Sequence, residues 1–584
     1  MKLISFLFVL ITIAGCTKQR DTGARELYLV SPEKFFGYDP IQSSDMYSAN
    51  EIGKVYEGLY EFHPLKRPYE LLPNIAEALP TVSEDGLTYT VKIHKGVFFH
   101  HDEAFSSGKG RELKASDFVY SFKRMADPKN TAKAWWILVD KLKGLDEWRA
   151  KYAKAEKTNY ADEIEGLKAI DDYTIQFILK TPAPQFLYSL AMAQTVAVAR
   201  EVVEKYGVEF INHPVGTGAF TLKKYDQTNR VVYLKNPDYR EKFYPTEGSE
   251  GDKEKGLLED AGKRLPLVDK ITVDVQVEEQ PKWQNFWKGK SDLILLPKDN
   301  FGNVLSSDGK VLPEISQKNV VLHIDPMLDT TYYAFNNEMK MFKDKRVRQA
   351  INLAFDRPTA NKLFYNNTAT TAQSVIPPGM GGYDKDYKNP YMELNLDRAK
   401  ALLKEAGYPE GKGFPVIKYE TLGQAFYRQS GEYFAKCVEK IGIKVVVNQN
   451  TWPELTNKVA RKQADMWGMA WGADYPDAEN FLGLFFCPNK APGSNGSNYC
   501  NPKFDELFVK ARMMQESPER NALYAELNRL VGEEVPWVFN FHRTRFHLAH
   551  GWLKNFKYTE FAQYQFQYLN VDNEKKGKMM VSFK

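Results

Sequence analysis

Hydrophobic and polar positions follow two different periods along the chain. Residues 26–30 and 87–93 alternate with the period of two that is typical of strands. Residues 345–355 instead place Val347, Ala350, Ile351 and Ala354 at helical spacing. Because such strands and helices follow one another repeatedly, the pattern predicts an α/β fold.

The same two periods predict the remaining elements. Residues 231–234 are expected to pair as a hairpin with a strand entered from a glycine turn at 216–222. The charged, lysine-rich segment 141–168 is expected to be an exposed helical insertion. The other predicted helices are 48–60, 113–125, 396–406, 425–440 and 453–462, and the other predicted strands are 174–179, 271–277, 331–335, 444–448, 465–469 and 535–541.

The amino terminus combines Lys2, an apolar run over 3–13, and the small residues Ala14 and Gly15 before Cys16. This run is too short for a stable membrane span, so it predicts a secretory signal peptide over residues 1–15. The alternative is an uncleaved amino-terminal anchor. The sequence Ile-Ala-Gly-Cys resembles a bacterial lipobox, which implies acylation of Cys16 and a lipidated linker over 16–25.

Length and charge narrow the function classes. A chain of 584 residues exceeds the size of one hydrophobic core, so two or more lobes are expected. The net charge is +4, from 79 basic and 75 acidic residues, a balance that does not indicate a nucleic-acid partner.

Two of the four cysteines flank a flexible polar loop. Cys487 and Cys500 enclose a segment rich in glycine, serine and asparagine. In an exported chain this arrangement predicts a loop-closing disulfide, and the further ligands that a zinc site requires are absent nearby. Cys437 lies at an apolar position and is predicted to be a buried free thiol.

The sequence contains no signature of catalysis or of a cofactor. It has no Gly-x-Ser-x-Gly elbow, no phosphate-binding loop and no His-Glu-x-x-His helix. We therefore expect a protein that is not an enzyme and binds no cofactor.

Two groups of histidines are candidate metal ligands. The run His-His-Asp-Glu at 100–103 is contiguous, so neighbouring side chains would point to opposite faces of a strand. His542, His547 and His550 are interleaved with two arginines that would repel a cation. Neither group predicts a metal site.

The segment 467–475, Trp-Gly-Met-Ala-Trp-Gly-Ala-Asp-Tyr, is the strongest candidate binding site. A strand there ends in small residues, which allow another backbone to approach closely. Asp474 follows at once and is able to pair with a ligand ammonium. The alternative is an aspartate that caps the loop, and spacing alone does not separate the two.

Three sequence blocks occur in an order that resembles one family. The first is Ser-Glu-Asp-Gly-Leu-Thr-Tyr-Thr-Val-Lys-Ile-His-Lys-Gly-Val-Phe-Phe-His-His-Asp at 83–102, continued by Ala-Ser-Asp-Phe-Val-Tyr-Ser-Phe-Lys-Arg at 115–124. The second is Pro-Val-Gly-Thr-Gly-Ala-Phe at 214–220 with Asn-Pro-Asp-Tyr at 236–239, and the third is Arg-Val-Arg-Gln-Ala-Ile-Asn-Leu-Ala-Phe-Asp-Arg at 346–357 with Ile-Pro-Pro-Gly at 376–379. With them, nearly the whole mature chain resembles the family 5 extracellular solute-binding proteins of peptide and nickel ABC importers.

This resemblance implies a periplasmic-binding-protein type II-like fold with two lobes and an extra third domain. It places domain I at 26–55, 205–328 and 535–584, domain II at 56–204, and domain III at 329–534. The lobes would close over the ligand by a hinge motion. It further implies a monomer in the cell envelope, on the periplasmic or outer face of a membrane, that delivers its ligand to an ABC permease.

Within the family, Ala473-Asp474-Tyr475 resembles the oligopeptide-binding branch. The resemblance implies that Asp474 binds the peptide α-ammonium and that the neighbouring backbone pairs with the peptide as an added strand. The candidate ligand-binding residues are Asp474, Trp471, Gly472, Ala473, Ser44, Asp45, Met46 and Asn540. Asp45 stands where a small residue is expected, so it either limits acidic ligands or points away.

Other features favour different ligands. The dipeptide-binding branch clamps the ligand carboxylate with an arginine near the position of Thr421, and here Arg428 lies some residues away. The Cys487–Cys500 pair, by contrast, resembles the disulfide of that branch. Because the family includes nickel binders, a nickel or metallophore ligand is the alternative to an oligopeptide.

Overall fold

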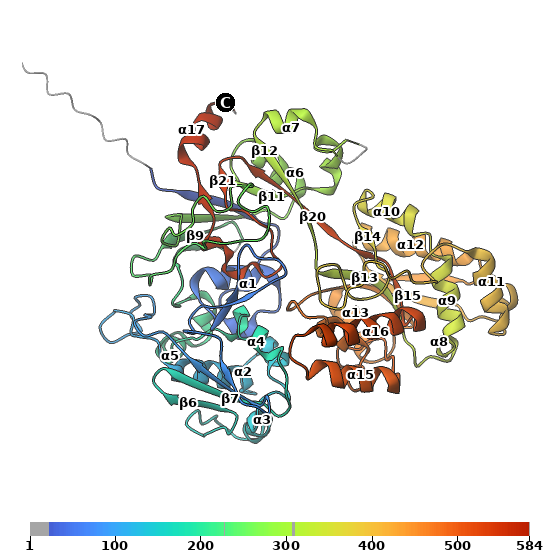
Figure 1. Ribbon diagram of the computed structural model, residues 1–584, viewed down its shortest axis with the longest axis horizontal. Helices are drawn as coiled ribbons and strands as arrows, with labels where there is room; N and C mark the ends of the chain where they lie inside the picture. Colours follow the sequence, from blue (N-terminus) through green and yellow to red (C-terminus); the bar gives the residue numbers. More distant parts are fainter. Residues whose placement is uncertain (1–22, 227, 307–309, 583–584) are drawn as a thin grey trace, which may run out of the picture.

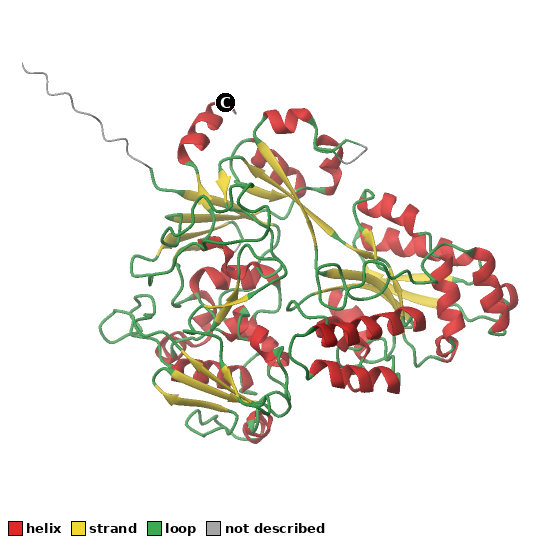
Figure 2. Cartoon of the chain, in the orientation of Figure 1, coloured by secondary structure: helices red, strands yellow, loops and turns green. Residues whose placement is uncertain are grey.

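The computed structural model describes residues 23–226, 228–306 and 310–582 (Figure 1). The predicted signal peptide and Cys16 lie outside the described residues. Sheets flanked by helices occur along the described chain, so the predicted α/β class is confirmed (Figure 2).

The first sheet contains the amino-terminal strand. Its order is β1-β10-β9-β8, with β1 and β10 parallel and the other neighbours antiparallel. The predicted hairpin of β8 with β9 is thereby confirmed. The strands are β1 (Glu26–Ser31), β10 (Lys270–Val275), β9 (Arg230–Lys235) and β8 (Phe220–Asp226).

The helix that follows β1 is shorter than predicted. Helix α1 spans Met46–Val55, whereas the periodicity predicted a helix to residue 60. The Glu57 carboxylate is buried beyond its end, where Arg240 donates to it over 2.9 Å and the Tyr239 hydroxyl over 2.8 Å. These partners are distant in sequence, so the local hydrophobic pattern does not predict that the helix ends at Val55.

A second sheet lies below the first in Figure 1, with order β4-β5-β7-β6. Its strands are β4 (Thr81–Val82), β5 (Thr88–Lys92), β7 (Thr174–Ile178) and β6 (Leu167–Asp171), and its helices are α2 (Ala115–Ala126), α3 (Leu145–Ala153), α4 (Phe186–Ser189) and α5 (Arg200–Tyr206). A short pair, β2 (Tyr60–Phe62) with β3 (Leu71–Pro73), precedes it.

The prediction of an exposed helical insertion at 141–168 was wrong. Only α3 is helical there, and Leu145, Trp148 and Tyr152 on it are buried. Three apolar side chains among many lysines suffice to dock this helix on the core.

The third large sheet has the order β16-β15-β17-β13-β18. Its strands are β16 (Val445–Asn450), β15 (Ile417–Leu422), β17 (Met466–Gly472), β13 (Asp329–Phe335) and β18 (Trp537–Phe539). Helices lie on both sides of it in Figure 2. They include α8 (Lys340–Lys343), α9 (Lys345–Ala354), α10 (Arg357–Tyr365), α11 (Leu396–Glu405), α12 (Ala425–Glu439), α13 (Trp452–Ala460), α14 (Glu479–Leu482), α15 (Pro502–Arg512) and α16 (Pro518–Glu534).

The chain crosses between two parts that Figure 1 shows side by side. We call residues 23–326 and 544–582 the first part, and residues 329–542 the second part. The crossings are β12 (Val320–Pro326) into β13, and β19 (Phe541–His542) into β20 (Thr544–His550). The Arg543 amide donates to the buried Asp329 carboxylate over 2.9 Å, and the Arg543 guanidinium pairs with it over 2.5 Å. This ion pair ties the two crossings together.

The remaining elements complete the two parts. In the first part, β12, β20 and β11 (Leu293–Leu295) form a sheet, next to α6 (Glu279–Trp287), α7 (Pro313–Gln317), β21 (Leu553–Lys554), β22 (Asn570–Val571) and α17 (Asn573–Ser582). In the second part, β14 (Thr370–Thr371) pairs with β19.

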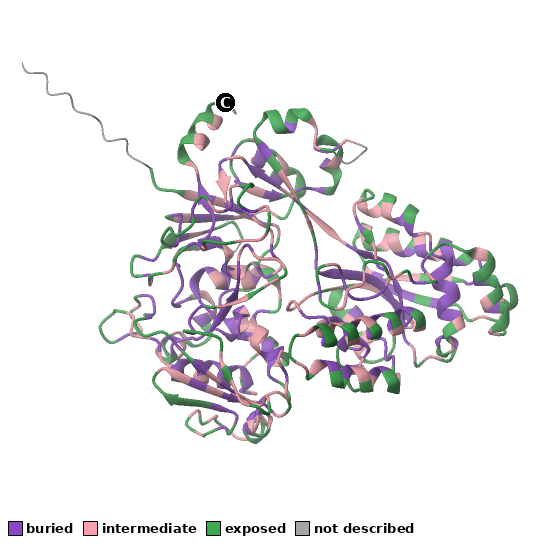
Figure 3. Cartoon of the chain, in the orientation of Figure 1, coloured by how far each residue is buried: buried purple, intermediate pink, exposed green. Residues whose placement is uncertain are grey.

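Burial is concentrated in the sheets, as Figure 3 shows for the second part, where the outer helices present exposed faces. Every residue of β13 is buried, because helices and the neighbouring strand cover it. In the described ranges, no helix is both long enough and apolar enough to cross a bilayer.

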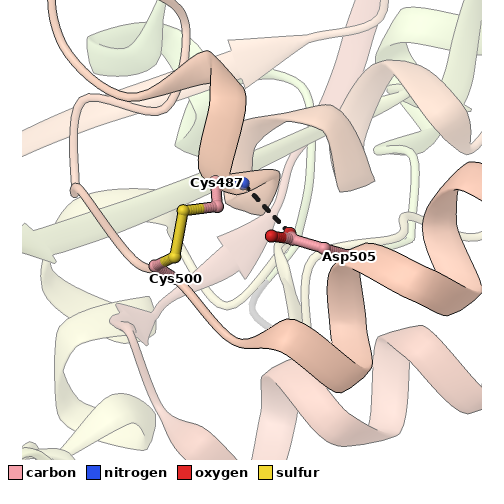
Figure 4. Close-up of side chains that lie close together, drawn as sticks. All are labelled: Cys487, Cys500 and Asp505. Atoms are coloured by element: carbon pink, nitrogen blue, oxygen red, sulfur yellow. Dashed lines mark hydrogen bonds between the residues drawn. A yellow bond between two sulfur atoms is a disulfide. The ribbon is translucent and has the colours of Figure 1, made fainter.

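The predicted disulfide joins Cys487 to Cys500 (Figure 4). The Cys487 amide donates to the Asp505 carboxylate at the start of α15 over 3.0 Å, which fixes the loop on that helix. Cys437 is a buried free cysteine, also as predicted.

Replacing Cys487 and Cys500 together by serine should lower the free energy of unfolding by about 3 kcal/mol, because the closed loop restricts the unfolded chain. Urea denaturation followed by tryptophan fluorescence measures this loss. A reducing agent should shift the wild-type transition towards that of the double variant and leave the variant itself unchanged. Equal stability of the oxidised wild type and the variant would contradict the stabilising role.

Candidate ligand-binding cleft

A cavity of about 630 Å³ lies between the two parts, which is within the usual size of a small-ligand site. The first part contributes residues around α1, the segment 133–141, α4 and its surroundings, and Glu560, Phe561 and Gln563. The second part contributes the end of β17 and the loops around α14. Six of the eight predicted ligand-binding residues line this cavity: Ser44, Asp45, Met46, Trp471, Ala473 and Asp474.

Asn480 holds the loop that carries Asp474. Its side-chain oxygen accepts from the Trp471 indole over 3.0 Å and from the Asp474 amide over 3.1 Å. Its side-chain nitrogen donates to the Asp474 carboxylate over 2.9 Å. The Ala473 amide donates to the Leu328 carbonyl over 2.9 Å, which links this loop to a crossing between the parts.

The charge of Asp474 is not compensated within the described part of the chain. No ion pair there involves its carboxylate, and its side-chain partner is the neutral Asn480. Burial raises the pKa of Asp474 above its usual range, although the hydrogen bond from Asn480 opposes this shift. A carboxylate in this setting gains most from a ligand that brings a positive charge.

Strand β17 offers a backbone edge beside this carboxylate. On one side it pairs with β13 along its whole length, from Asp329 opposite Gly472 to Phe335 opposite Met466. On the other side β15 pairs with Met466 and Trp467 alone, so in the described structure the edge from 468 to 472 has no strand partner. A Cβ at Gly472 would meet no atom within 4 Å, which leaves room for a ligand backbone.

Asp45 faces the amino terminus of its own helix. It is the N-cap of α1, and its carboxylate accepts from the Ser48 amide over 2.8 Å and from the Ser48 hydroxyl over 2.9 Å. These bonds explain an acidic residue where the sequence comparison expected a small one. Asp45 therefore differs from Asp474, because its charge is already used by the helix.

Asn540 and Thr421 lie in a separate pocket of about 190 Å³ on the sheet of the second part. The pocket is largely aromatic and also touches residues 468–470 of β17. Arg428 pairs with Glu432 on α12 over 2.9 Å and lines neither cavity. The structure therefore brings no arginine from α12 to the position that a dipeptide clamp would need.

The candidate metal ligands do not converge. His100 Nε2 donates to the Gly218 carbonyl in the interior, and exposed His101 lies beside Asp238. His542 contacts the Asp329 carbonyl, whereas His550 contacts the Phe286 carbonyl. Within the described residues, one cluster has donor atoms close enough for a metal, and it consists of the disulfide sulfurs with Asp505 (Figure 4). Disulfide sulfurs are not thiolates, so this cluster does not suit a metal.

Sequence reasoning missed several groups of the cavity. Asn480 had only a weak signal, a polar residue near the start of a short helix after Asp474. Glu560, whose carboxylate accepts from the Leu328 amide over 3.0 Å, comes from the last part of the chain without any local motif. Lys141 lay in the segment expected to be an exposed insertion, yet it lines the cavity.

Comparisons with known proteins agree with this architecture. The family model for bacterial extracellular solute-binding proteins, family 5 (middle), matches residues 70–493. Di/tripeptide-binding protein 2 of Pseudomonas aeruginosa is 29% identical, over 90% of this chain and 88% of that protein. The dipeptide-binding protein of Escherichia coli is 25% identical, over 96% of this chain and 97% of that protein.

A solved structure extends the likeness to the fold. The ABC transporter-associated periplasmic binding protein DppA of Helicobacter pylori, in complex with the peptide STSA, superposes with a TM-score of 0.72 at 25% identity. The match covers 94% of this chain and 99% of that chain, which confirms the predicted type II-like periplasmic-binding fold. The family model spans more than half of the sequence, and the chain therefore belongs to the family 5 bacterial extracellular solute-binding proteins, which are non-enzymatic components of transport systems.

Proposed function

We propose that this protein captures short oligopeptides with a free amino terminus and delivers them to the permease of an ABC importer. The observation that carries the proposal is the uncompensated carboxylate of Asp474 in the cavity, beside an open strand edge. Two observations support the same ligand class. The relatives are named as dipeptide-binding or di/tripeptide-binding proteins, and the Helicobacter pylori structure contains a peptide.

In this proposal the peptide ammonium pairs with Asp474, and the peptide backbone pairs with the free edge of β17. Recognition of the backbone is independent of side chains, so broad sequence specificity follows. Residues Trp471, Gly472 and Ala473 provide that edge, and Ser44 and Met46 face it from the first part. Asn540 would contact a ligand that extends along β17 into the smaller pocket.

Replacing Asp474 by asparagine should weaken binding of trialanine by at least about tenfold, because the charge-assisted bond to the peptide ammonium is lost. Isothermal titration calorimetry measures the two affinities. N-acetylated trialanine, which lacks the ammonium, should bind the wild type and the variant equally poorly. Glu432→Gln on the surface of α12 is the matched control and should bind like the wild type.

The pH dependence supplies a second readout of the same contact. As the pH falls through the raised pKa of Asp474, the carboxylate is protonated and the attraction to the ammonium is lost. Wild-type affinity should therefore decrease from neutral to acid pH, while the peptide ammonium stays protonated throughout. A variant Asp474→Asn with wild-type affinity, or with the same pH dependence as the wild type, would refute the assignment.

We also propose that the crossings at 326–329 and 542–544 act as the hinge for closure of the two parts over the ligand. Strand β18 pairs with β13, which moves our proposed boundary of the second part from 535 to about 543. The two parts already meet beside the cavity. Tyr188 stacks on Tyr475 with their ring centres 6.0 Å apart, and the side-chain nitrogen of Gln185 donates to the Arg512 carbonyl over 2.9 Å. These contacts are able to report closure.

Small-angle X-ray scattering should show a smaller radius of gyration for the wild type after addition of trialanine, because closure brings the two parts together. The variant Asp474→Asn, at a peptide concentration that leaves it unoccupied, should show no change. A wild type that binds the peptide by calorimetry with an unchanged radius would contradict the hinge.

We propose further that the mature protein is a monomer anchored in the cell envelope by lipid on Cys16. The support is the amino-terminal sequence pattern, because Cys16 lies outside the described residues. Replacing Cys16 by serine should release the protein from the membrane fraction, since acyl chains provide the attachment. Intact-mass measurement of the wild type should show the added acyl groups, and a membrane-bound Cys16→Ser variant would rule out this anchor.

A further inference from the structure

Lys141 lines the same cavity as Asp474. It belongs to the turn between the short helix Lys133–Ile137 and α3, in the first part, whereas Asp474 belongs to the second part. The turn is fixed by its backbone: the Lys141 amide donates to the Leu138 carbonyl over 3.1 Å, and the Lys180 amide donates to the Lys141 carbonyl over 2.8 Å. Leu142 beside it is fully buried. The fold therefore holds Lys141 against the cavity.

The ammonium of Lys141 has no partner in the described part of the structure. No hydrogen bond or ion pair there involves its Nζ, although the side chain is half-buried. The neighbouring Lys180 is also largely shielded, yet it pairs with Asp146 over 2.9 Å. Burial lowers the pKa of Lys141, the negative charge of Glu479 opposes this shift, and the positive charge of Arg512 adds to it. An ammonium in this setting is stabilised by an anion that the protein itself does not supply.

The acidic groups near Lys141 are engaged elsewhere. The Glu479 carboxylate accepts from the Tyr475 hydroxyl over 2.5 Å and lies 4.0 Å from the Arg512 guanidinium. Asp140, the preceding residue, lies 3.5 Å from the ammonium of Lys180. Neither carboxylate forms an ion pair with Lys141 in the described structure. Lys133, the other lysine of the lining, lies over the Phe36 ring at 4.4 Å, whereas Lys141 has no such contact there.

We propose that Lys141 binds a carboxylate of the peptide ligand, so that the cavity selects peptides that carry both a free amino group and a carboxylate. This inference rests on the proposed function, because it assigns the second charge of the same ligand. Opposite charges that line one cavity from the two parts match a zwitterion, and a ligand without a carboxylate leaves the Lys141 ammonium desolvated and unpaired. The carboxylate is either the peptide carboxyl terminus or an acidic side chain, and both present the same chemistry.

The test compares two pairs of peptides by calorimetry. Trialanine against its carboxyl-terminal amide isolates the terminal carboxylate, and Ala-Glu-Ala amide against Ala-Gln-Ala amide isolates an acidic side chain. The wild type should prefer the carboxylate-bearing member of at least one pair by about tenfold or more. Lys141→Met should reduce that preference to nearly one, with the affinity for the neutral member changed by no more than about twofold.

Two variants separate charge from structure. Lys141→Arg keeps the positive charge and should retain most of the preference. Lys143→Met, two residues along the same turn and outside the cavity lining, should bind like the wild type. Thermal unfolding should show that Lys141→Met is at least as stable as the wild type, since it removes an uncompensated charge.

The possible outcomes separate the role of Lys141 from the proposed peptide-binding function. If Lys141→Met loses the preference within the trialanine pair, Lys141 binds the carboxyl terminus of the peptide. If it loses the preference within the glutamate pair, Lys141 binds an acidic side chain of the peptide. A wild type that binds all four peptides without preference, or a Lys141→Met variant that keeps the preference, overturns the inference and leaves the peptide function standing. A wild type that binds none of the four overturns both.

Discussion

The half-buried carboxylate of Asp474 is the constraint around which the cleft is built. Asn480 fixes its position with a neutral amide, and no cation of the described chain neutralises it. Burial of a carboxylate without a cationic partner has a desolvation cost, and a structural role does not require that cost. Under the proposed function, the ammonium of the peptide offsets this cost, so the cleft would favour ligands with a free amino group.

The architecture keeps this charge at the boundary between the two parts. Asp329 begins β13 and also binds Arg543 at the other crossing, so one ion pair fixes both connections. The loop of Asp474 is attached to the same place through the bond from Ala473 to Leu328. In the proposed hinge motion, this bond would link the movement of the two parts to the loop that carries Asp474.

Local pattern was sufficient to predict much of the fold. Strand β5 alternates between buried and more exposed residues, and helix α9 buries the apolar residues that recur at helical spacing, as their hydrophobic periods predict. The end of α1 was not predictable, since it depends on Glu57 meeting Arg240 almost two hundred residues later. The prediction for segment 141–168 was wrong for a related reason. Its many lysines indicated an exposed segment, although a few apolar side chains of α3 pack on the core.

The site was predictable to the extent that it lies on a motif. Asp474 follows β17 directly, and the fold places it in the cavity with the neutral partner Asn480, so its role as ligand anchor stays a prediction. For Asp45, the structure shows a carboxylate that caps a helix. Lys141 and Glu560 carry no motif, because their positions in the cavity result from packing between distant segments.

The identity of the ligand that the protein carries when it is isolated from cells tests the central claim most directly. Native mass spectrometry of the folded protein, followed by sequencing of the released ligand, gives that identity. The account predicts a mixture of short peptides with unmodified amino termini and varied side chains. A single metal complex, or peptides whose amino termini are blocked, would contradict it.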